Sequence, residues 1–229
     1  MSELFVLSNI VKKYVKGSEV VSIFDNVNLD IAAADFVAIM GPSGSGKTTL
    51  LNLLGGIDQV TSGSLGFGGE QLERYDEARL SKWRARNVGF IFQSYNLIPM
   101  LNAAQNVELP LLLTNLKAKA RAAHVKTALE LVGLSDRARH YPKEMSGGQQ
   151  QRVAIARALV ADPVLLLCDE PTGDLDRKTA DEILGILRIL NRDFGKTIVM
   201  VTHDPAAAAY AKRTLHLDKG VFTEDIAYA

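Results

Sequence analysis

A glycine-rich loop at residues 41–49, with the sequence GPSGSGKTT, constrains this chain more than any other feature. It fills the phosphate-loop pattern G-x-x-x-x-G-K-[ST], and it lies between an apolar run at 36–40 and a leucine-rich run at 47–54. The first run has the length of a buried strand, and the second has the pattern of a helix that packs its leucines inward. This strand-to-helix context predicts an α/β fold that binds a nucleotide.

The residue types in this loop suit a polyphosphate. Glycines let the backbone wrap closely around an anion, and the helix N-terminus adds unpaired N–H groups and a positive dipole end. Lys47 is expected to reach the β and γ phosphates, and the Thr48 hydroxyl is expected to ligate Mg²⁺. The predicted nucleotide contacts of the loop are Gly41, Ser43, Gly44, Ser45, Gly46, Lys47, Thr48 and Thr49.

Charge and composition exclude several other classes of protein. The 229 residues include 26 basic and 26 acidic side chains, so no overall attraction to nucleic acid or anionic lipid is predicted. The single cysteine, Cys168, excludes an intrachain disulfide and suits a reducing compartment. No apolar run approaches the roughly 20 residues that span a bilayer, and the N-terminus lacks the pattern of a signal peptide. We therefore expect any membrane-spanning part to be a separate chain.

Strand-like runs precede the phosphate loop. Those at 5–7, 20–24 and 27–31 predict a small antiparallel sheet, and a glycine-rich hairpin is predicted at 60–70. Tyr14 lies in the first region, where an aromatic side chain can either stack on an adenine base or cover the sheet edge.

Three later apolar strands each end in polar residues. The strand at 88–92 is followed by Gln93, the strand at 164–168 by Asp169 and Glu170, and the strand at 197–201 by Thr202, His203 and Asp204. Parallel strands gather their carboxyl ends at one edge of a sheet, where α/β folds place ligands. Asp169 is expected to hold Mg²⁺, directly or through water, and Glu170 to deprotonate an attacking water. The alternative for this acidic pair is a helix cap.

Residues 94–160 have a helical pattern instead. Helices are predicted at 117–132 and 150–160, and a loop of Ser146, Gly147, Gly148 and Gln149 precedes the second. Ser146 is a natural N-cap, so the loop offers a hydroxyl and bare amides as a second anion site. Taken alone, the same residues are equally well explained as a helix N-cap that follows a flexible loop.

In this order, the phosphate loop, Gln93, the loop 146–149, Asp169-Glu170 and His203 resemble the ATP-binding subunit of an ABC transporter over nearly the whole chain. The resemblance implies ATP and Mg²⁺ as cofactors. It also implies that two copies pair head to tail, so that the signature loop of each copy (Ser146, Gly147, Gly148 and Gln149) closes on ATP held by the other.

The resemblance further implies a P-loop NTPase (RecA-like) core with an N-terminal antiparallel β subdomain and an inserted α-helical subdomain. We expect one ABC ATPase domain over residues 1–229. Within it, residues 1–93 and 157–229 would form the β subdomain and core, and residues 94–156 the helical subdomain.

Individual roles follow from the resemblance. Tyr14 takes the adenine-stacking place, Glu170 becomes the general base, and Asp176 lies at the dimer interface. His203 contacts the γ phosphate, whereas the other three histidines have no such support. The implied metal ligands are Thr48, Gln93 and Asp169, and the implied catalytic residues are Lys47, Gln93, Glu170 and His203.

Residues 88–113 resemble the macrolide-export and lipoprotein-release branch, whose ATPases serve membrane subunits that drive extracytoplasmic movements. The apolar stretch 96–113 would then dock an integral membrane permease. The protein would lie peripherally at the cytoplasmic face of the inner or plasma membrane.

Three residues depart from the pattern of the family. Met145 replaces the usual leucine before the signature loop, a change that conserves volume. Cys168 closes its strand as a small buried apolar residue. Asp174 stands where this branch often has asparagine, and its charge near the subunit interface is expected to slow closure around ATP.

Other functions compete with export or lipoprotein release. A division-type regulator of a cell-wall hydrolase uses the same cassette, and the sequence separates it poorly. A DNA-repair ATPase normally needs a long coiled-coil insertion, and a ribosome-associated ATPase two cassettes; neither is seen here. An importer is a weaker alternative, because the chain ends 26 residues after His203 and leaves no room for an appended regulatory domain.

Overall fold

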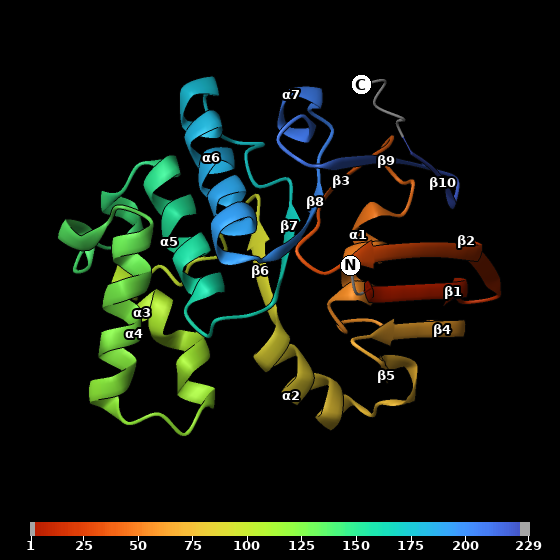
Figure 1. Ribbon diagram of the computed structural model, residues 1–229, viewed down its shortest axis with the longest axis horizontal. Coiled ribbons are helices and arrows are strands. Elements are labelled where there is room, and N and C mark those ends of the chain that lie inside the picture. Colours follow the sequence, from red (N-terminus) through yellow and green to blue (C-terminus); the bar gives the residue numbers. More distant parts are fainter. Residues whose placement is uncertain (1–2, 225–229) are drawn as a thin grey trace.

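Two sheets and a group of helices make up the molecule, seen in a computed structural model that describes residues 3–224 (Figure 1). The central sheet has the order β10-β9-β3-β8-β7-β6. Its strands are β3 (Phe36–Met40), β6 (Val88–Phe92), β7 (Leu165–Asp169), β8 (Thr197–Val201), β9 (Arg213–Asp218) and β10 (Val221–Glu224). All neighbouring pairs are parallel except β9 with β10. The carboxyl ends of β3, β6, β7 and β8 therefore share one edge.

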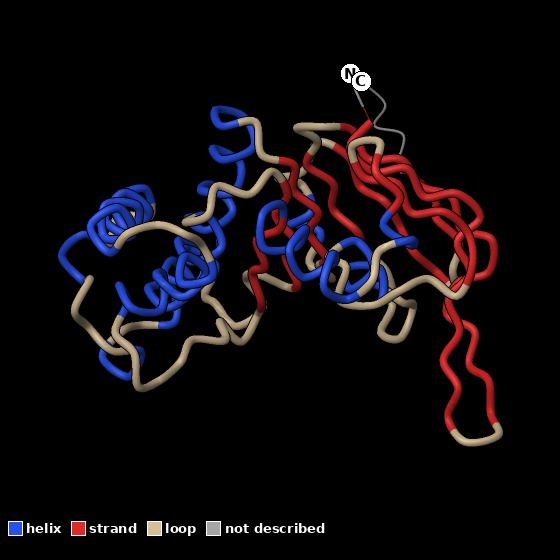
Figure 2. The backbone as a smooth tube through the Cα atoms, turned by 90° about the horizontal axis from the view of Figure 1, so that it is seen from below, coloured by secondary structure: helices blue, strands red, loops and turns tan. Residues whose placement is uncertain are grey.

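The N-terminal sheet is antiparallel, with the order β2-β1-β4-β5. It consists of β1 (Glu3–Lys16), β2 (Glu19–Ala32), β4 (Ser62–Phe67) and β5 (Glu70–Gln71). The expectation of three short strands before the loop was wrong, because β1 and β2 are two strands of 14 residues in one hairpin. Register irregularities, with Asn9 and Asn26 at φ 52° and 62°, break the alternation of side chains within continuous strands. The hairpin tip projects from the body (Figure 2).

The central sheet separates two apolar cores, because successive side chains of a strand point to opposite faces. On β3, Phe36 and Ala38 pack into the core shared with the helical end, whereas Val37 and Ile39 pack into the core shared with the N-terminal sheet. All four side chains are at most 1% exposed. Such two-sided burial explains why the parallel strands read as continuous apolar runs.

The helices cover both sides of this sheet. They are α1 (Lys47–Leu54), α2 (Glu77–Asn87), α3 (Ala103–Glu108), α4 (Ala118–Leu131), α5 (Gly147–Leu159), α6 (Arg177–Phe194) and α7 (Pro205–Ala208). Short 3₁₀ turns lie at Leu72–Arg74, Leu109–Leu113, Ser135–Arg137 and Pro142–Glu144. Helices α3, α4 and α5 gather at the end opposite the N-terminal sheet (Figure 1). Within residues 3–224, no helix is both long and apolar enough to cross a membrane.

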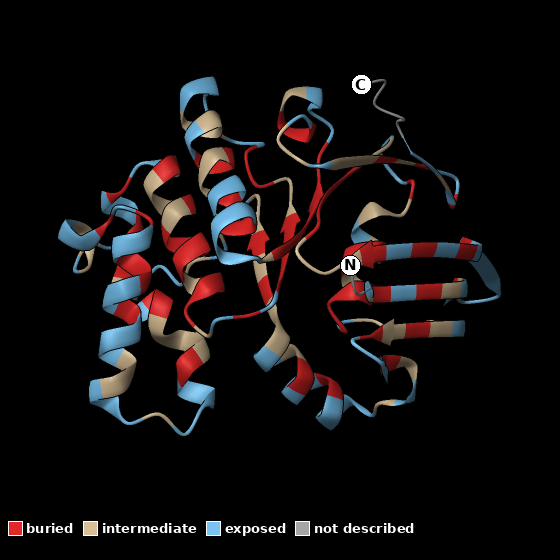
Figure 3. Ribbon diagram, in the orientation of Figure 1, coloured by how far each residue is buried: buried red, intermediate tan, exposed pale blue. Residues whose placement is uncertain are grey.

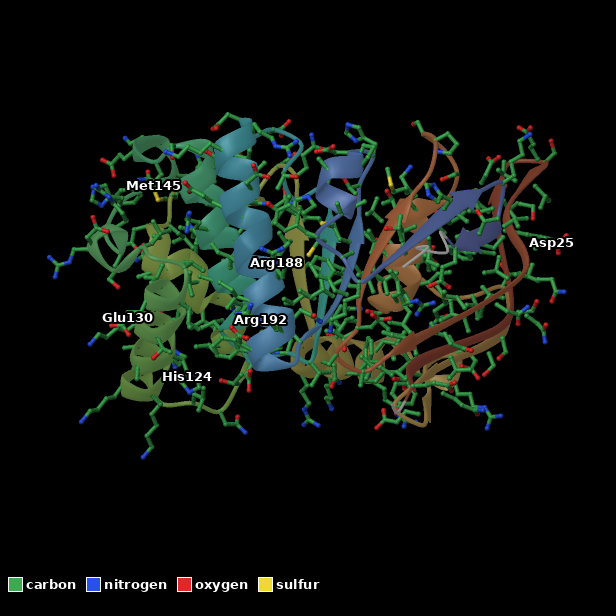
Figure 4. All side chains as sticks on the ribbon, turned by 45° about the horizontal axis from the view of Figure 1, so that its top comes forward. Asp25, His124, Glu130, Met145, Arg188 and Arg192 are labelled. Atoms are coloured by element: carbon green, nitrogen blue, oxygen red, sulfur yellow. The ribbon has the colours of Figure 1, made fainter. Side chains whose placement is uncertain are left out.

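One helix joins the helical end to the sheet. Helix α5 runs through the predicted junction between residues 156 and 157, so it contributes to both parts of the molecule. Figure 3 shows its buried residues facing the neighbouring helices and the sheet. By contrast, α4 is buried along one side only, and His124 and Glu130 lie on its outer surface (Figure 4).

Candidate active site

A cleft of about 710 Å³ opens at the carboxyl edge of the central sheet. The predicted residues that line it are Gly41, Ser43, Gly44, Gly46, Lys47, Thr48, Thr49, Gln93, Asp169, Glu170 and His203. They come from the ends of β3, β6, β7 and β8 and from the first turn of α1. The fold thus brings together four segments that are far apart in the sequence.

The phosphate loop is built on glycines that no other residue can replace without strain. Gly46 is the N-cap of α1 at φ 103°, and a Cβ there would lie 2.9 Å from Ile23 Cγ2. A Cβ at Gly41 would lie 2.1 Å from the backbone oxygen of Leu217. Because Gly46 has no side chain to cap the helix, the first N–H groups of α1 remain available to an anion.

Two polar side chains of the loop differ in their hydrogen bonding: one has no partner, and the other bonds back to the loop itself. The buried Ser45 hydroxyl has no hydrogen-bond partner in the described part of the chain. Lys47 Nζ donates to the backbone oxygens of Gly41 and Pro42, at 2.8 Å each. The lysine is therefore folded back onto its own loop, with a positive charge held where phosphate oxygens would lie.

Glu170 and His203 form a pair across the cleft. Glu170 has a left-handed backbone at φ 49°, which is strained for a residue with a side chain. Its amide donates to Val201 O at 3.0 Å, and its Oε1 lies 2.9 Å from His203 Nδ1. The hydrogen bond to Glu170, together with the Glu170 charge, raises the pKa of His203. The pair is thus held at the sheet edge by both backbone and side chain.

The oxygen donors of the cleft fit Mg²⁺. Thr48, Gln93 and Asp169 all line it, and Mg²⁺ binds through one or two carboxylates together with substrate phosphates. Residues 3–224 contain no cluster of three or more acidic, histidine or cysteine side chains that could hold a metal ion by themselves. Burial raises the pKa of the Asp169 carboxyl, and the Glu170 charge raises it further against the opposing effect of Lys47. A cation at this place would relieve that repulsion.

Gln93 is hydrogen-bonded to the loop that follows β7. Its Nε2 donates to Asp174 Oδ1 at 2.9 Å, and a Cβ at Gly173 would lie 3.0 Å from the Gln93 amide. A carboxylate only accepts hydrogen bonds, so the nitrogen of the Gln93 amide faces Asp174. The amide oxygen has no hydrogen-bond partner among residues 3–224.

Some predicted residues lie outside the cleft. The signature loop caps α5, where Ser146 Oγ accepts from Gln149 N at 3.3 Å and Gln149 Oε1 accepts from Ser146 N at 3.0 Å. Asp176 caps α6 and accepts from Thr179 N at 3.1 Å. Tyr14 Oη donates to Asp58 Oδ2 at 2.6 Å on the N-terminal sheet. None of these residues is among those that line the cleft in the described structure.

The cleft also contains residues that the sequence patterns missed: Ile23, Phe92, Ser94, Asn96 and Val201. Phe92 and Val201 end predicted strands, so their place at the edge could have been inferred. Ile23 lies on β2, and the sequence carries no signal for its contact with the loop.

Gln151, which does not line the cleft, was also missed. It is fully buried, and its Nε2 donates to the backbone oxygens of Phe92 and Pro171.

Comparisons with known proteins agree with this geometry. The family described as ABC transporter matches residues 24–173. The chain is 44% identical over 225 residues to the lipoprotein-releasing system ATP-binding protein LolD of Geobacter metallireducens, covering 98% of this chain and 100% of that protein. It is 46% identical over 222 residues to the macrolide export ATP-binding/permease protein MacB 1/2 of Paracoccus denitrificans, covering 97% of this chain but 33% of that longer protein.

A solved structure is similar over the same extent. It is a dimeric ATP-binding cassette of Methanocaldococcus jannaschii in a post-hydrolysis state, bound to ADP and phosphate. The TM-score is 0.88 at 42% sequence identity, and the match covers 96% of this chain and 97% of the other.

Proposed function

The chain belongs to the ABC transporter family as an ATP-binding subunit, and from this premise we propose that it hydrolyses ATP to drive a separate membrane permease of the lipoprotein-release or macrolide-export kind. The observation that carries the proposal is the single cleft that holds the phosphate loop, Gln93, Asp169, Glu170 and His203. The protein would act at the cytoplasmic face of the membrane, bound to the permease.

Lys47 would move when ATP binds. Its ammonium exchanges the carbonyl oxygens of Gly41 and Pro42 for oxygens of the β and γ phosphates, while the N–H groups at the start of α1 donate to the same phosphates. These donors are positioned before the reaction, so they stabilise the charge that develops on the transferring group.

Glu170 would accept the proton of the attacking water. Its carboxylate lies at the sheet edge beside His203, so the imidazole orients the base and is itself placed to donate to the γ phosphate. The raised pKa of His203 favours the protonated donor. Bound at Thr48, Asp169 and Gln93, Mg²⁺ would supply charge neutralisation on the β and γ phosphates.

A second copy of the chain would complete the site. The signature loop of this chain lies outside its own cleft, so the hydroxyl and amides at the start of α5 can reach ATP only in another copy. The cassette that the fold resembles is dimeric, which supports the pairing of two copies. Asp176, at the exposed start of α6, would lie in the interface.

The permease would dock beside residues 96–113. A second cleft of about 510 Å³ lies there, lined by Phe90, Asn96, Leu109, Pro110, Leu113 and Arg157 among others. The same stretch carries exposed apolar side chains, with Met100 and Leu113 each 82% exposed and Leu112 55% exposed. A helix of a membrane partner would cover this apolar surface.

Purification from the native host tests the proposal. The Glu170→Gln protein should bind ATP without turning it over, so ATP and Mg²⁺ should stabilise its complex with the permease during gentle solubilisation. We expect a polytopic membrane protein with a large extracytoplasmic domain to co-purify. Recovery of the soluble dimer alone, or of nucleic acid or ribosomes, would contradict the transport function, and a cell-wall hydrolase in the complex would favour the division alternative.

A matched pair of variants tests the docking surface. Leu113→Asp should prevent co-purification, because it places a charge in the apolar surface. Leu131→Asp changes a leucine that is 47% exposed on α4, away from that cleft, and should have no effect. Equal recovery with both variants would remove residues 96–113 from the interface.

A further inference from the structure

Tyr14 is held by a partly buried ion pair that no motif contains. Lys12 Nζ lies 2.6 Å from Asp58 Oδ1, and Tyr14 Oη donates to the other carboxylate oxygen, Oδ2, at 2.6 Å. The Lys12 ammonium also lies 4.5 Å from the centroid of the Tyr14 ring. One carboxylate and one ammonium thus hold the aromatic ring by its hydroxyl and by one of its faces.

The ammonium has a complete set of partners. Lys12 is 7% exposed, and Nζ donates to Asp58 Oδ1 and to Gln59 O at 2.8 Å, with the aromatic face as its third contact. A lysine is rarely buried unless it is paired. Tyr14, by contrast, is 39% exposed. Because Lys12 covers one face of the ring, a ligand can stack only on the other.

Asp58 connects this cluster to the phosphate-loop helix. Its amide donates to Asn52 O of α1 at 3.2 Å, and its Oδ1 accepts from Gln59 N at 2.7 Å. Burial, with the hydrogen bond to Asp58, raises the pKa of the Tyr14 phenol, whereas the Thr49 hydroxyl lowers it. Thr49 also lines the phosphate cleft, so Asp58 and Tyr14 both contact the helix that begins at the phosphate loop.

From these contacts we propose that Lys12 and Asp58 are positioning residues that fix the Tyr14 ring as a platform for the nucleobase, at a set distance from the phosphate loop. The inference rests on the proposed binding of ATP and on Tyr14 as its stacking residue. Fixing the ring before binding removes the entropy cost of ordering it in the complex. The positive charge of the ammonium also withdraws electron density from the ring. A ring with less electron density stacks more favourably on an electron-rich purine.

The test compares ATP with inorganic tripolyphosphate as ligands of the intact protein, by isothermal titration calorimetry. Tripolyphosphate occupies the phosphate loop but has no base, so a loss of general structure weakens both ligands equally. Tyr14→Ala should weaken the binding of ATP by about 10-fold, since stacking on a base is worth about 1–3 kcal/mol. It should leave the affinity for tripolyphosphate unchanged.

Two milder variants isolate the positioning effect. Tyr14→Phe keeps the ring and removes only the bond to Asp58, and Asp58→Asn removes the charge that pairs with Lys12. Each should weaken ATP about 3-fold relative to tripolyphosphate. Tyr75→Phe is the matched control, because Tyr75 Oη also donates to a carboxylate, Glu70, at 2.6 Å, and Arg79 lies 3.9 Å from its ring centroid. That control should change neither affinity.

The outcomes distinguish base stacking on Tyr14 from the positioning of Tyr14 by Lys12 and Asp58. If Tyr14→Ala leaves the ratio of ATP to tripolyphosphate affinity unchanged, both base stacking and the positioning role are wrong. If Tyr14→Ala lowers the ratio while Tyr14→Phe and Asp58→Asn do not, the stacking stands and the role of Lys12 and Asp58 is overturned. If Asp58→Asn unfolds the protein, Tyr14→Phe alone decides, because its exposed ring keeps its packing.

Discussion

The phosphate loop and the signature loop both lie at the start of a helix, yet their polar groups are satisfied differently. At α1 the N-cap is a glycine without a capping side chain, the Ser45 hydroxyl has no partner among the described residues, and Lys47 bonds to its own loop. At α5 the N-cap Ser146 and Gln149 satisfy each other through a reciprocal capping box. At the start of α1, backbone N–H groups are therefore available to a ligand bound in the cleft of the same chain. At the start of α5, the capping box satisfies the N-terminal groups without a ligand.

This difference shows how one chain can divide a binding site between two copies. The incomplete loop lies inside the cleft, where a polyphosphate would satisfy it. The self-capped loop lies outside and keeps its shape until a partner arrives. We therefore expect large effects for changes at the phosphate loop and smaller, dimer-dependent effects elsewhere.

Removing the charge of the phosphate loop should have the largest effect. Lys47→Ala is expected to lower the rate of ATP hydrolysis at least about 100-fold, because it deletes a positioned donor to the transferring phosphoryl group. Lys126→Ala, on the exposed face of α4, is the control and should hydrolyse ATP at the normal rate. A release assay for phosphate measures both. Near-normal turnover by Lys47→Ala would place the chemistry elsewhere.

Matched glycine variants compare the backbones of the two helix starts. Gly46→Ala adds a Cβ at φ 103° against Ile23 and Phe24, so we expect the free energy of unfolding to fall by about 1–3 kcal/mol. Gly147→Ala adds a Cβ whose closest contact, at 2.7 Å, is the movable hydroxyl end of Tyr95, and it should cost less than about 1 kcal/mol. Urea denaturation measures both values. Equal losses would mean that the two loops are equally strained.

A smaller effect is expected at the subunit interface. Asp174→Asn should tighten ATP-dependent dimerisation of the Glu170→Gln protein by about 2- to 5-fold, because it removes an exposed charge and leaves an oxygen to accept from Gln93. Analytical ultracentrifugation measures the affinity. Asp25→Asn, on the distant N-terminal sheet, is the control for net charge (Figure 4). An unchanged dimer affinity would remove Asp174 from the interface.

The smallest effect concerns the titration of His203. Glu170 raises its pKa by stabilising the imidazolium, so the contribution of this pair to stability is present below the usual histidine pKa and is lost as the pH rises through the raised one. Glu170→Gln should lower the pKa of His203. Imidazole NMR signals against pH report the change, with those of His124 on α4 as internal reference. A pKa that stays raised would mean that Glu170 is not its cause.

Much of the fold follows from short-range patterns. The prediction for the helix at 47–54 and for the strands at 88–92 and 197–201 is confirmed, because in each case one apolar pattern coincides with clear ends. Ser146 is confirmed as an N-cap.

The rest depends on contacts between distant segments. Strand β9 joins the central sheet beside β3 after a region of weak pattern, and nothing local predicts that pairing. The set of residues at the sheet edge could be predicted, because parallel strands bring their ends together. The Lys12–Asp58 pair and the bond from Gln93 to Asp174 join residues 46 and 81 positions apart, and no periodicity in the sequence specifies them.

The most direct test of the divided site mixes two defective proteins, both carrying Glu170→Gln to prevent hydrolysis. One also carries Lys47→Ala, which breaks the phosphate loop, and the other Ser146→Arg, which blocks the signature loop. Ultracentrifugation with ATP should show each protein alone as a monomer and an equimolar mixture as a dimer, because the mixture contains one intact pair of loops. A mixture that remains monomeric, or Ser146→Arg protein that dimerises alone, would contradict the account.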